Sequence, residues 1–400
     1  MRNSKAWSVS TALFYAFCAT DRVQAQESPN VEIRTGVLAA SNPFLTGGDD
    51  AGSIALTMDV LPEFRWEDET STIVLDGQIT VEEWLNRYDT DLSGQAALKV
   101  DKAVSETLAL FGEAAFETSK RATRGLLTGQ IGEGAIPTNG ANLDLAPILV
   151  DQTVRRQSAL ASLGAEKKLS STQTLRGEIL STANWFDQQG ADYRTSSLEL
   201  EYIQKLNPRF ELVFGANGAL SDFLEQSRGD GAFGAAHLGM KVQLSSTGSL
   251  SANAGVVLVR TNTGTGGTEN GEFLIANVEF CEELFQGKMC ASGFRESRPT
   301  TIGGASTVTA GSFTWSKEFG RNEILNLDLR YSDTKPTLAA FDLANVGRTK
   351  FLGVTAYYTR PISESVGLYI NPSAVKLFDD PFDRGSNYQM MVGLTFNFGR

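Results

Sequence analysis

His237 is the single histidine of this 400-residue chain, and it lies on the polar face of the segment AAHLGMKVQL. Histidine often serves as a general base, working beside an acid or a nucleophilic serine. No nucleophile motif accompanies His237, and a lone histidine on a polar face is more simply a hydrogen-bonded structural residue. We therefore expect no catalytic residues and no enzymatic activity, with an enzyme kept as the least favoured alternative.

The segment DTDLSG begins like a calcium-binding loop, with Asp89, Asp91, Ser93 and Gly94 at the appropriate spacing. Such a loop closes on a bidentate glutamate, and Val100 occupies that position here. We interpret the segment as an acidic external loop. The stretches GGDD and DDPFD are interpreted in the same way. No metal site, cofactor-binding residue or cofactor is predicted.

Cys281 and Cys290 are close in sequence, in CEELFQGKMC, and are the cysteines that remain once an N-terminal leader is removed. If a tight turn separates two paired strands here, the two thiols come within disulfide reach. Two thiols without a neighbouring histidine are too few for a zinc site. We therefore predict a disulfide between Cys281 and Cys290.

Most of the chain alternates apolar and polar residues with a period of two, which is typical of β-strands with two different faces. In GSIALTMDVLPEFRWEDE, for example, Ile54, Leu56 and Met58 occupy one face while Thr57 and Asp59 occupy the other. Similar segments last about 10–13 residues, long enough to cross a bilayer as tilted strands. Strands of soluble proteins usually end near five or six residues.

Short and long connections alternate along the chain, as in transmembrane barrels with periplasmic turns and longer external loops. The pattern predicts an all-β protein, a single antiparallel transmembrane β-barrel of about 18 strands. A total of 16 is the next most favoured, because the strands near 31–41, 155–167 and 288–297 are weakly marked. A secreted β-sandwich or propeller is the alternative fold, but it would use shorter strands and bury its apolar faces against each other.

Residues 1–25 have the features of a cleaved secretory signal peptide: basic residues, a short apolar run and small residues before Gln26. The predicted domains are therefore a signal peptide at 1–25 and a barrel at 26–400. The whole chain has a net charge of -12. Since the leader carries three basic residues and one acid, the mature chain has about -14, which makes nucleic acid an unfavourable partner.

A barrel of this size leaves an aqueous channel unless something fills it, and charges that face lipid are costly. The charged residues on the polar face are therefore predicted to line the lumen. They are Asp59, Glu63, Arg65, Asp76, Glu82, Glu113, Arg176, Glu178, Glu199, Glu201, Glu211, Lys241, Asp328, Arg330 and Arg360. Individually each is explained by cross-strand ion pairing, but collectively they indicate a mildly acidic passage for polar solutes.

The connection 118–152 is much longer than its neighbours, and ordered long loops are usually functional. Its first part carries Lys120, Arg121 and Arg124, which could face acidic residues of the wall if the loop folds into the lumen. We therefore predict a constriction loop here. A flexible external loop is the equally favoured alternative.

The chain ends NYQMMVGLTFNFGR, whose alternation places Tyr388, Phe396 and Phe398 on one face. Together with the leader and the early segment SNPFLTGGDDAGSIALTMDVLPEFRWEDE, this ending resembles outer-membrane β-barrels of alphaproteobacteria, in particular porin-like barrels of exopolysaccharide export loci. Such barrels usually end on an aromatic residue, whereas Gly399 and Arg400 follow Phe398 here. The resemblance covers the mature chain as a pattern and transfers no catalytic residue.

Taken together, the sequence predicts an outer-membrane channel of a Gram-negative bacterium for hydrophilic solutes, associated with polysaccharide export if the resemblance holds. A mainly structural or partner-binding barrel with a blocked lumen is the alternative. The expected partners are outer-membrane lipid and lipopolysaccharide, the barrel assembly machinery and polysaccharide export components. Neither the solute nor the oligomeric state is indicated.

Overall fold

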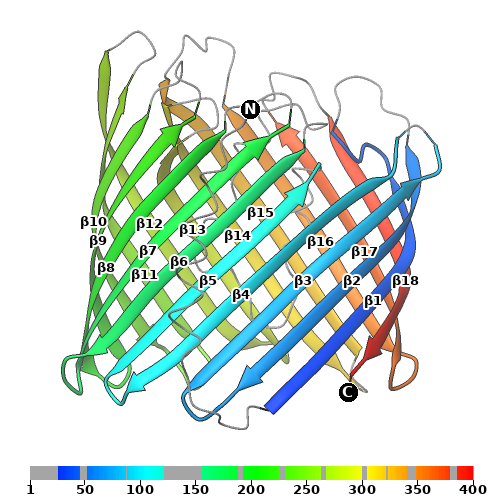
Figure 1. Ribbon diagram of the computed structural model, residues 1–400, viewed down its shortest axis with the longest axis horizontal. Helices are drawn as coiled ribbons and strands as arrows, with labels where there is room; N and C mark the ends of the chain where they lie inside the picture. The colour runs from blue at the N-terminus through cyan, green and yellow to red at the C-terminus, as the bar shows by residue number, and fades with distance from the viewer. Residues whose placement is uncertain are drawn as a thin grey trace, which may run out of the picture.

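The computed structural model describes residues 26–45, 52–86, 88–120, 155–187, 192–224, 230–262, 267–299, 304–320, 323–339, 348–378 and 385–399. These residues form one 18-stranded antiparallel sheet, closed into a barrel (Figure 1). Within them, no helix is long and apolar enough to span a membrane. The residues of the predicted leader, 1–25, lie outside the described part of the chain.

The strands follow one another in sequence order around the barrel. They are β1 (Gln26–Ala40), β2 (Ser53–Glu67), β3 (Ser71–Trp84), β4 (Asp91–Ser105), β5 (Leu108–Ser119), β6 (Arg156–Lys168), β7 (Gln173–Phe186), β8 (Tyr193–Asn207), β9 (Phe210–Phe223), β10 (Gly231–Gln243), β11 (Ser249–Asn262), β12 (Thr268–Leu284), β13 (Gly287–Pro299), β14 (Gly304–Phe319), β15 (Glu323–Ala339), β16 (Thr349–Pro361), β17 (Val366–Phe378) and β18 (Ser386–Phe398). The prediction of 18 strands is confirmed, and so is the antiparallel barrel.

Each strand has 12–17 residues, somewhat longer than the sequence pattern suggested. Connections of 2–5 residues alternate with mostly longer ones, and the short turns gather at the end of the barrel where β1 begins and β18 ends (Figure 1). A strand that crosses a bilayer has no water to satisfy its backbone, so every edge must be paired. The chain meets this requirement by pairing β18 with both β17 and β1, from Val31↔Phe398 to Ala40↔Gln389.

Two prolines lie inside strands, and each interrupts a ladder on one side only. Pro62 pairs with Val31 of β1, but the β2–β3 register skips from Val60 to Glu63. Pro372 pairs with β18 in the same way, while the β16–β17 ladder is interrupted beside it. Since proline has no N–H to donate, a gap on one side is its expected effect within a sheet.

Candidate channel lumen

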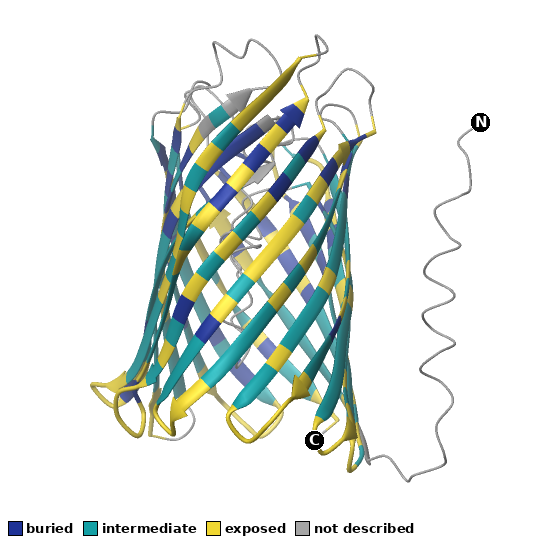
Figure 2. Cartoon of the chain, turned by 90° about the vertical axis from the view of Figure 1, so that its left-hand side faces the viewer, coloured by how far each residue is buried: buried dark blue, intermediate teal, exposed yellow. Residues whose placement is uncertain are grey.

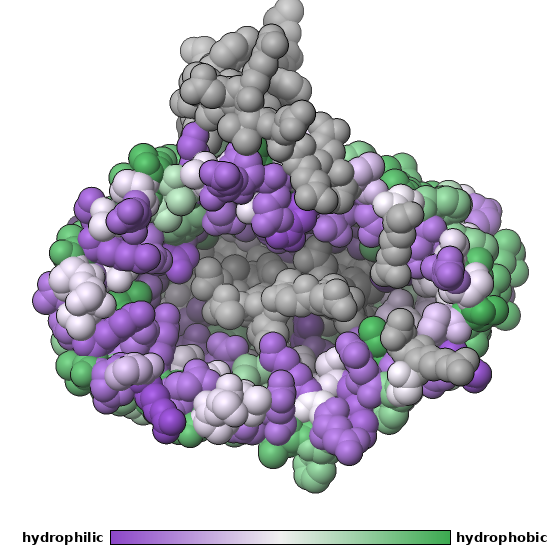
Figure 3. All heavy atoms as spheres, turned by 90° about the horizontal axis from the view of Figure 1, so that it is seen from below, coloured by the Kyte–Doolittle hydropathy of each residue, from purple (hydrophilic) through white to green (hydrophobic). Residues whose placement is uncertain are grey.

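The two faces of the sheet differ in chemistry. Along β2 the residues Ser53–Asp59 alternate strictly between buried and exposed, and the exposed ones are Ile54, Leu56 and Met58. Figure 2, which is coloured by burial, shows exposed and more buried residues following one another along neighbouring strands. Viewed along the barrel, hydrophilic residues surround the central hollow and hydrophobic residues lie on the outer surface (Figure 3). A closed barrel with an apolar exterior and a polar interior has the architecture of a transmembrane β-barrel.

The strand registers place fourteen of the fifteen predicted lumen residues on the inner face. These are Asp59, Glu63, Arg65, Asp76, Glu82, Glu113, Arg176, Glu178, Glu199, Glu201, Glu211, Lys241, Asp328 and Arg330. Ten of them are acids and four are bases, so this set carries an excess of negative charge.

Arg360 is the exception, and its assignment to the lumen is corrected here. It shares the outward face of β16 with Val354 and Tyr358, because the β15–β16 register runs without a shift to Thr359. Its Nε lies 3.5 Å from Oε1 of Glu323, which also accepts a hydrogen bond from Tyr358 at Oε2. Arg360 stands one residue before the end of its strand, where an outward charge reaches the membrane interface at little cost.

Several inner charges are neutralised by close neighbours. Arg330 donates to both carboxylate oxygens of Asp328, at 2.7 and 3.1 Å. Longer pairs join Lys99 to Asp76 at 3.8 Å and Lys205 to Glu211 at 3.4 Å. These pairs remain partly exposed to solvent, so each contributes at most about 1 kcal/mol to stability.

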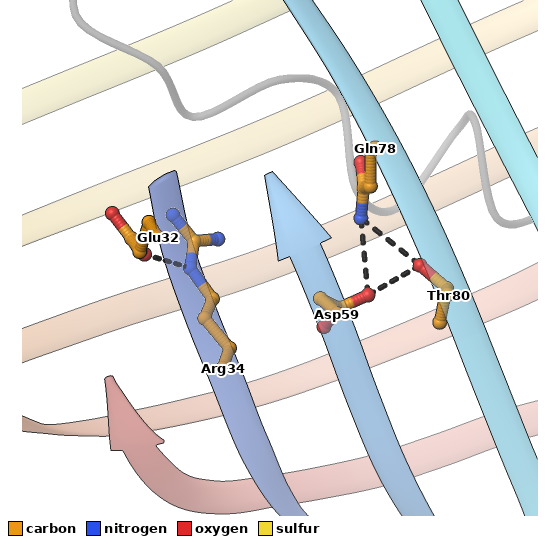
Figure 4. A network of polar contacts seen from close by, with 5 residues as sticks. All are labelled: Glu32, Arg34, Asp59, Gln78 and Thr80. Atoms are coloured by element: carbon orange, nitrogen blue, oxygen red, sulfur yellow. Dashed lines mark hydrogen bonds and ion pairs between the residues drawn. The ribbon is translucent and has the colours of Figure 1, made fainter. Parts of the chain in front are cut away.

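A denser polar network lines the wall where the first and last strands meet. Arg34 of β1 forms an ion pair with Glu32 and lies 5.7 Å from the ring centroid of Tyr357. On β2 and β3, Asp59 accepts hydrogen bonds from Thr80 and from Gln78, the latter at 3.1 Å (Figure 4). Asp59 is directly opposite Arg34 in the register. Glu32 and Arg34 were not predicted as lumen residues, because β1 is weakly marked in the sequence.

A second cluster lies on β7, β8 and β10, and we call Arg176, Glu178, Glu199, Glu201 and His237 the wall cluster. Glu178 is directly opposite Glu199, and Arg176 is opposite Glu201. Arg176 contacts Glu178 at 3.5 Å, and its guanidinium lies 4.6 Å from the ring centroid of Phe111. His237 Nε2 lies 3.8 Å from Glu201 Oε1. Sequence reasoning found all five residues but did not bring them together.

Near the end of the barrel that carries the longer connections, buried apolar side chains form clusters in two places. Phe44 packs on Trp84 and Tyr88, with ring centroids 5.8 and 4.6 Å apart, above Leu38 and Ala55. Neither this aromatic cluster nor its inward position was predicted, since the residues come from β1–β3 and the following connections.

The second cluster involves a departure from simple pairing. The β12–β13 ladder ends at Ala276↔Arg295, although both strands continue beyond it. Ala305–Val308 at the start of β14 are all buried, which means that both faces of the strand are covered. Ala305 packs with Phe233 of β10 and with Val257 and Val259 of β11. The external part of β14 therefore overlaps the inner surface of β10–β12.

The other predicted sites have simple positions. Cys281 and Cys290 are paired residues of β12 and β13, with Cα atoms 4.1 Å apart, and they form a disulfide. The connecting turn, Phe285–Gln286, has positive φ at both residues, as tight hairpin turns require. Asp91 begins β4, where Arg155 binds its carboxylate at 3.4 Å. Lys120 directly follows β5, whereas Arg121 and Arg124 lie outside the described residues.

No protein-family model matches the chain, and no curated protein sequence matches it. Among solved structures it is similar to the FrpB iron transporter of Neisseria meningitidis (F5-1 variant), with a TM-score of 0.48, 9% identity and coverage of 93% of this chain and 83% of the other. It is also similar to OccK2 (OpdF) of Pseudomonas aeruginosa, solved in complex with glucuronate, with a TM-score of 0.47, 9% identity and coverage of 93% and 98%. OccK9 (OpdG) of the same organism gives a TM-score of 0.46, 12% identity and coverage of 93% and 98%.

Proposed function

We propose that the chain forms a water-filled channel across the outer membrane for small hydrophilic solutes, with a preference for cationic or neutral ones. The observation that supports this most directly is the separation of faces: exposed apolar residues outside and an acid-rich set of charges inside one closed sheet. Carboxylates that line a pore attract cations and repel anions. A structural barrel with a blocked lumen would not need so many charges on its inner face.

Polysaccharide export is a narrower form of this proposal, and it rests on the sequence resemblance alone. Neutral sugar chains are compatible with a hydrated lumen, but nothing in the described residues selects them over smaller solutes. The neighbouring genes provide its test. Polysaccharide polymerase and export genes beside this one would favour the narrower form, and their absence would leave general uptake.

Conductance of the purified barrel in planar bilayers tests the channel itself. We expect discrete conductance steps and a reversal potential that indicates cation preference under a salt gradient. Replacing Glu199 and Glu201 together with Gln should shift the reversal potential toward zero, since two inner charges are lost. The matched control is Glu323→Gln, which removes an outward carboxylate beside Arg360 and should leave the reversal potential unchanged. A membrane that stays sealed at all voltages would refute the channel and favour a blocked barrel.

A further inference from the structure

The wall cluster brings an imidazole and two carboxylates to one place on the lumen wall. One ligand atom each of Glu199, Glu201 and His237 lie within 4.8 Å of one another. The three residues come from only two strands, β8 and β10, and the intervening strand β9 separates them. Two carboxylates and one neutral imidazole form a donor set that suits a divalent first-row transition metal ion.

Glycines on both neighbouring strands make this arrangement possible. In the register, Glu201, Gly215, His237 and Gly255 lie side by side across β8–β11. A Cβ atom placed on Gly215 would lie 2.1 Å from both Cε1 and Nε2 of His237, so the ring lies flat over this glycine. A side chain on β9 would therefore push the imidazole away from Glu201.

The imidazole is held closely in the wall and faces a carboxylate. Its side chain is only 7% exposed, and its Nε2 lies 3.8 Å from Oε1 of Glu201, which is beyond the usual length of a hydrogen bond. A metal ion placed between this nitrogen and this oxygen could bind both of them.

The local charges also favour a cation at this point. Glu178 and Glu199 are directly opposite each other, and like charges in that arrangement are destabilising. Arg176 lies close to Glu178, whereas Glu199 has no ion pair within the described part of the chain. A cation bound to Glu199 and Glu201 would relieve this repulsion, and Glu178 could supply a further oxygen.

We propose that Glu199, Glu201 and His237 bind a divalent transition metal ion on the lumen wall. Metal–ligand bonds of about 2.1 Å require ligand atoms roughly 3–3.5 Å apart. The carboxylate groups must therefore rotate so that their oxygen atoms move by about 1 Å toward the ion. Calcium is disfavoured because it takes six to eight oxygens and no imidazole. The proposal does not depend on conduction, since binding can be measured on the purified barrel in detergent.

Copper(II) is the best probe, because it binds such sites most strongly among these metals. The chain must be prepared without a histidine tag, so that any imidazole nitrogen coupling in the electron paramagnetic resonance spectrum comes from His237. We expect one Cu²⁺ per barrel with nitrogen coupling. His237→Gln should abolish the coupling, and both His237→Gln and Glu201→Gln should weaken binding more than ~10-fold.

Two variants distinguish a specific metal site from non-specific binding of Cu²⁺ to carboxylates. Gly215→Ala keeps all three ligands but displaces the ring, so it should weaken Cu²⁺ binding as much as His237→Gln in a barrel that still folds. Glu113→Gln removes an inner carboxylate elsewhere and should leave binding unchanged. Binding without nitrogen coupling, wild-type affinity in Gly215→Ala, or equal loss in Glu113→Gln would each overturn the proposal. If binding is found but bilayers stay sealed, only the channel proposal fails.

Discussion

Two regions of the barrel wall lie on opposite sides of the barrel. In each of them an aromatic ring packs over glycine residues of neighbouring strands, but the groups around the two rings differ. In the seam region, where β18 meets β1, Tyr369 covers Gly393 and Gly36, which are its successive neighbours in the register. In the wall cluster, His237 covers Gly215. The device is the same, since a ring that packs over a cross-strand glycine compensates for the missing side chain.

The seam region is closed and tightly packed. Tyr369 is fully buried and stacks on Tyr357 at 6.1 Å, and Arg34 beside them is paired with Glu32. In the wall cluster, two acids lie directly opposite each other, and the imidazole Nε2 is 3.8 Å from the nearest oxygen of Glu201. The comparison suggests that the seam region serves the stability of the closed barrel, while the wall cluster gathers carboxylates and an imidazole that a ligand can use.

Removing the last strand is the strongest test of the seam region. Deletion of 388–400 takes away the partner of both β17 and β1, and two open edges cannot be satisfied in lipid. We expect no inserted barrel, measured as loss of the heat-modifiable band in gel electrophoresis of membrane fractions. Deletion of 399–400 alone, which lies beyond β18, should leave insertion intact. A correctly inserted 388–400 truncation would refute this role for the seam region.

Removing one cation from each region gives the next largest contrast. Arg34 is about a quarter exposed and forms an ion pair with Glu32. Arg34→Met should therefore lower the free energy of unfolding by about 2–3 kcal/mol, which is less than the loss of about 3–5 kcal/mol when a fully buried pair is broken. Arg176 is 42% exposed, so Arg176→Met should cost about 1 kcal/mol from its ion pair and its contact with Phe111. The midpoints of denaturant unfolding, followed by tryptophan fluorescence, measure both. Equal costs would remove the distinction between the regions.

The glycines provide a finer comparison at constant side-chain size. A Cβ on Gly393 would lie 2.1 Å from the backbone oxygen of Thr35, so Gly393→Ala forces the strands apart and should cost about 1–3 kcal/mol. A Cβ on Gly215 meets only the movable ring of His237, so Gly215→Ala should cost less than about 1 kcal/mol. Unfolding midpoints of the two variants test this order. A larger loss in Gly215→Ala would mean that His237 is itself a structural anchor.

Features that are set within a single strand could be predicted from the sequence, whereas features that depend on the pairing of different strands could not. Alternation within a strand is local, and it predicted the strands correctly. It also predicts an inner position for residues such as Asp59 and Glu201, and the strand registers agree with that prediction. The error at Arg360 was avoidable, because counting in steps of two from Val354 places it outside. The placement of His237 over Gly215 depends on the β9–β10 register, which the sequence does not specify.

The overlap at the external end was beyond prediction for a different reason. The start of β14, GASTV, consists mostly of small residues without a clear alternation. Its burial results from packing on β10 and β11, which lie several strands away in the sheet. The alternation of residues within one segment gives no information about a contact between strands that are not neighbours in the sheet.

The short turn between β2 and β3, outside both regions, provides a reference for small electrostatic effects. The exposed carboxylate of Asp68 accepts hydrogen bonds from the Ser71 hydroxyl at 2.7 Å and from the backbone N–H groups of Thr70 and Ser71 at 2.8 and 2.7 Å. These bonds, that of the Ser71 hydroxyl first, lower the pKa of Asp68 from 3.8 to about 2. A pKa that is lowered on folding means that the ionised form stabilises the turn.

The stabilisation by Asp68 should therefore be fully present above pH 3.8 and disappear as the pH falls through about 2. Asp68→Asn should lower the unfolding midpoint slightly at pH 7, and the difference from the wild type should vanish near pH 2. Glu69→Gln changes the same charge in the same turn. Glu69 makes no hydrogen bond within the described turn. The unfolding midpoint of the Glu69→Gln variant should therefore match that of the wild type over the same pH range. A difference between Asp68→Asn and the wild type that persists below pH 2 would show that the carboxylate acts through packing rather than charge.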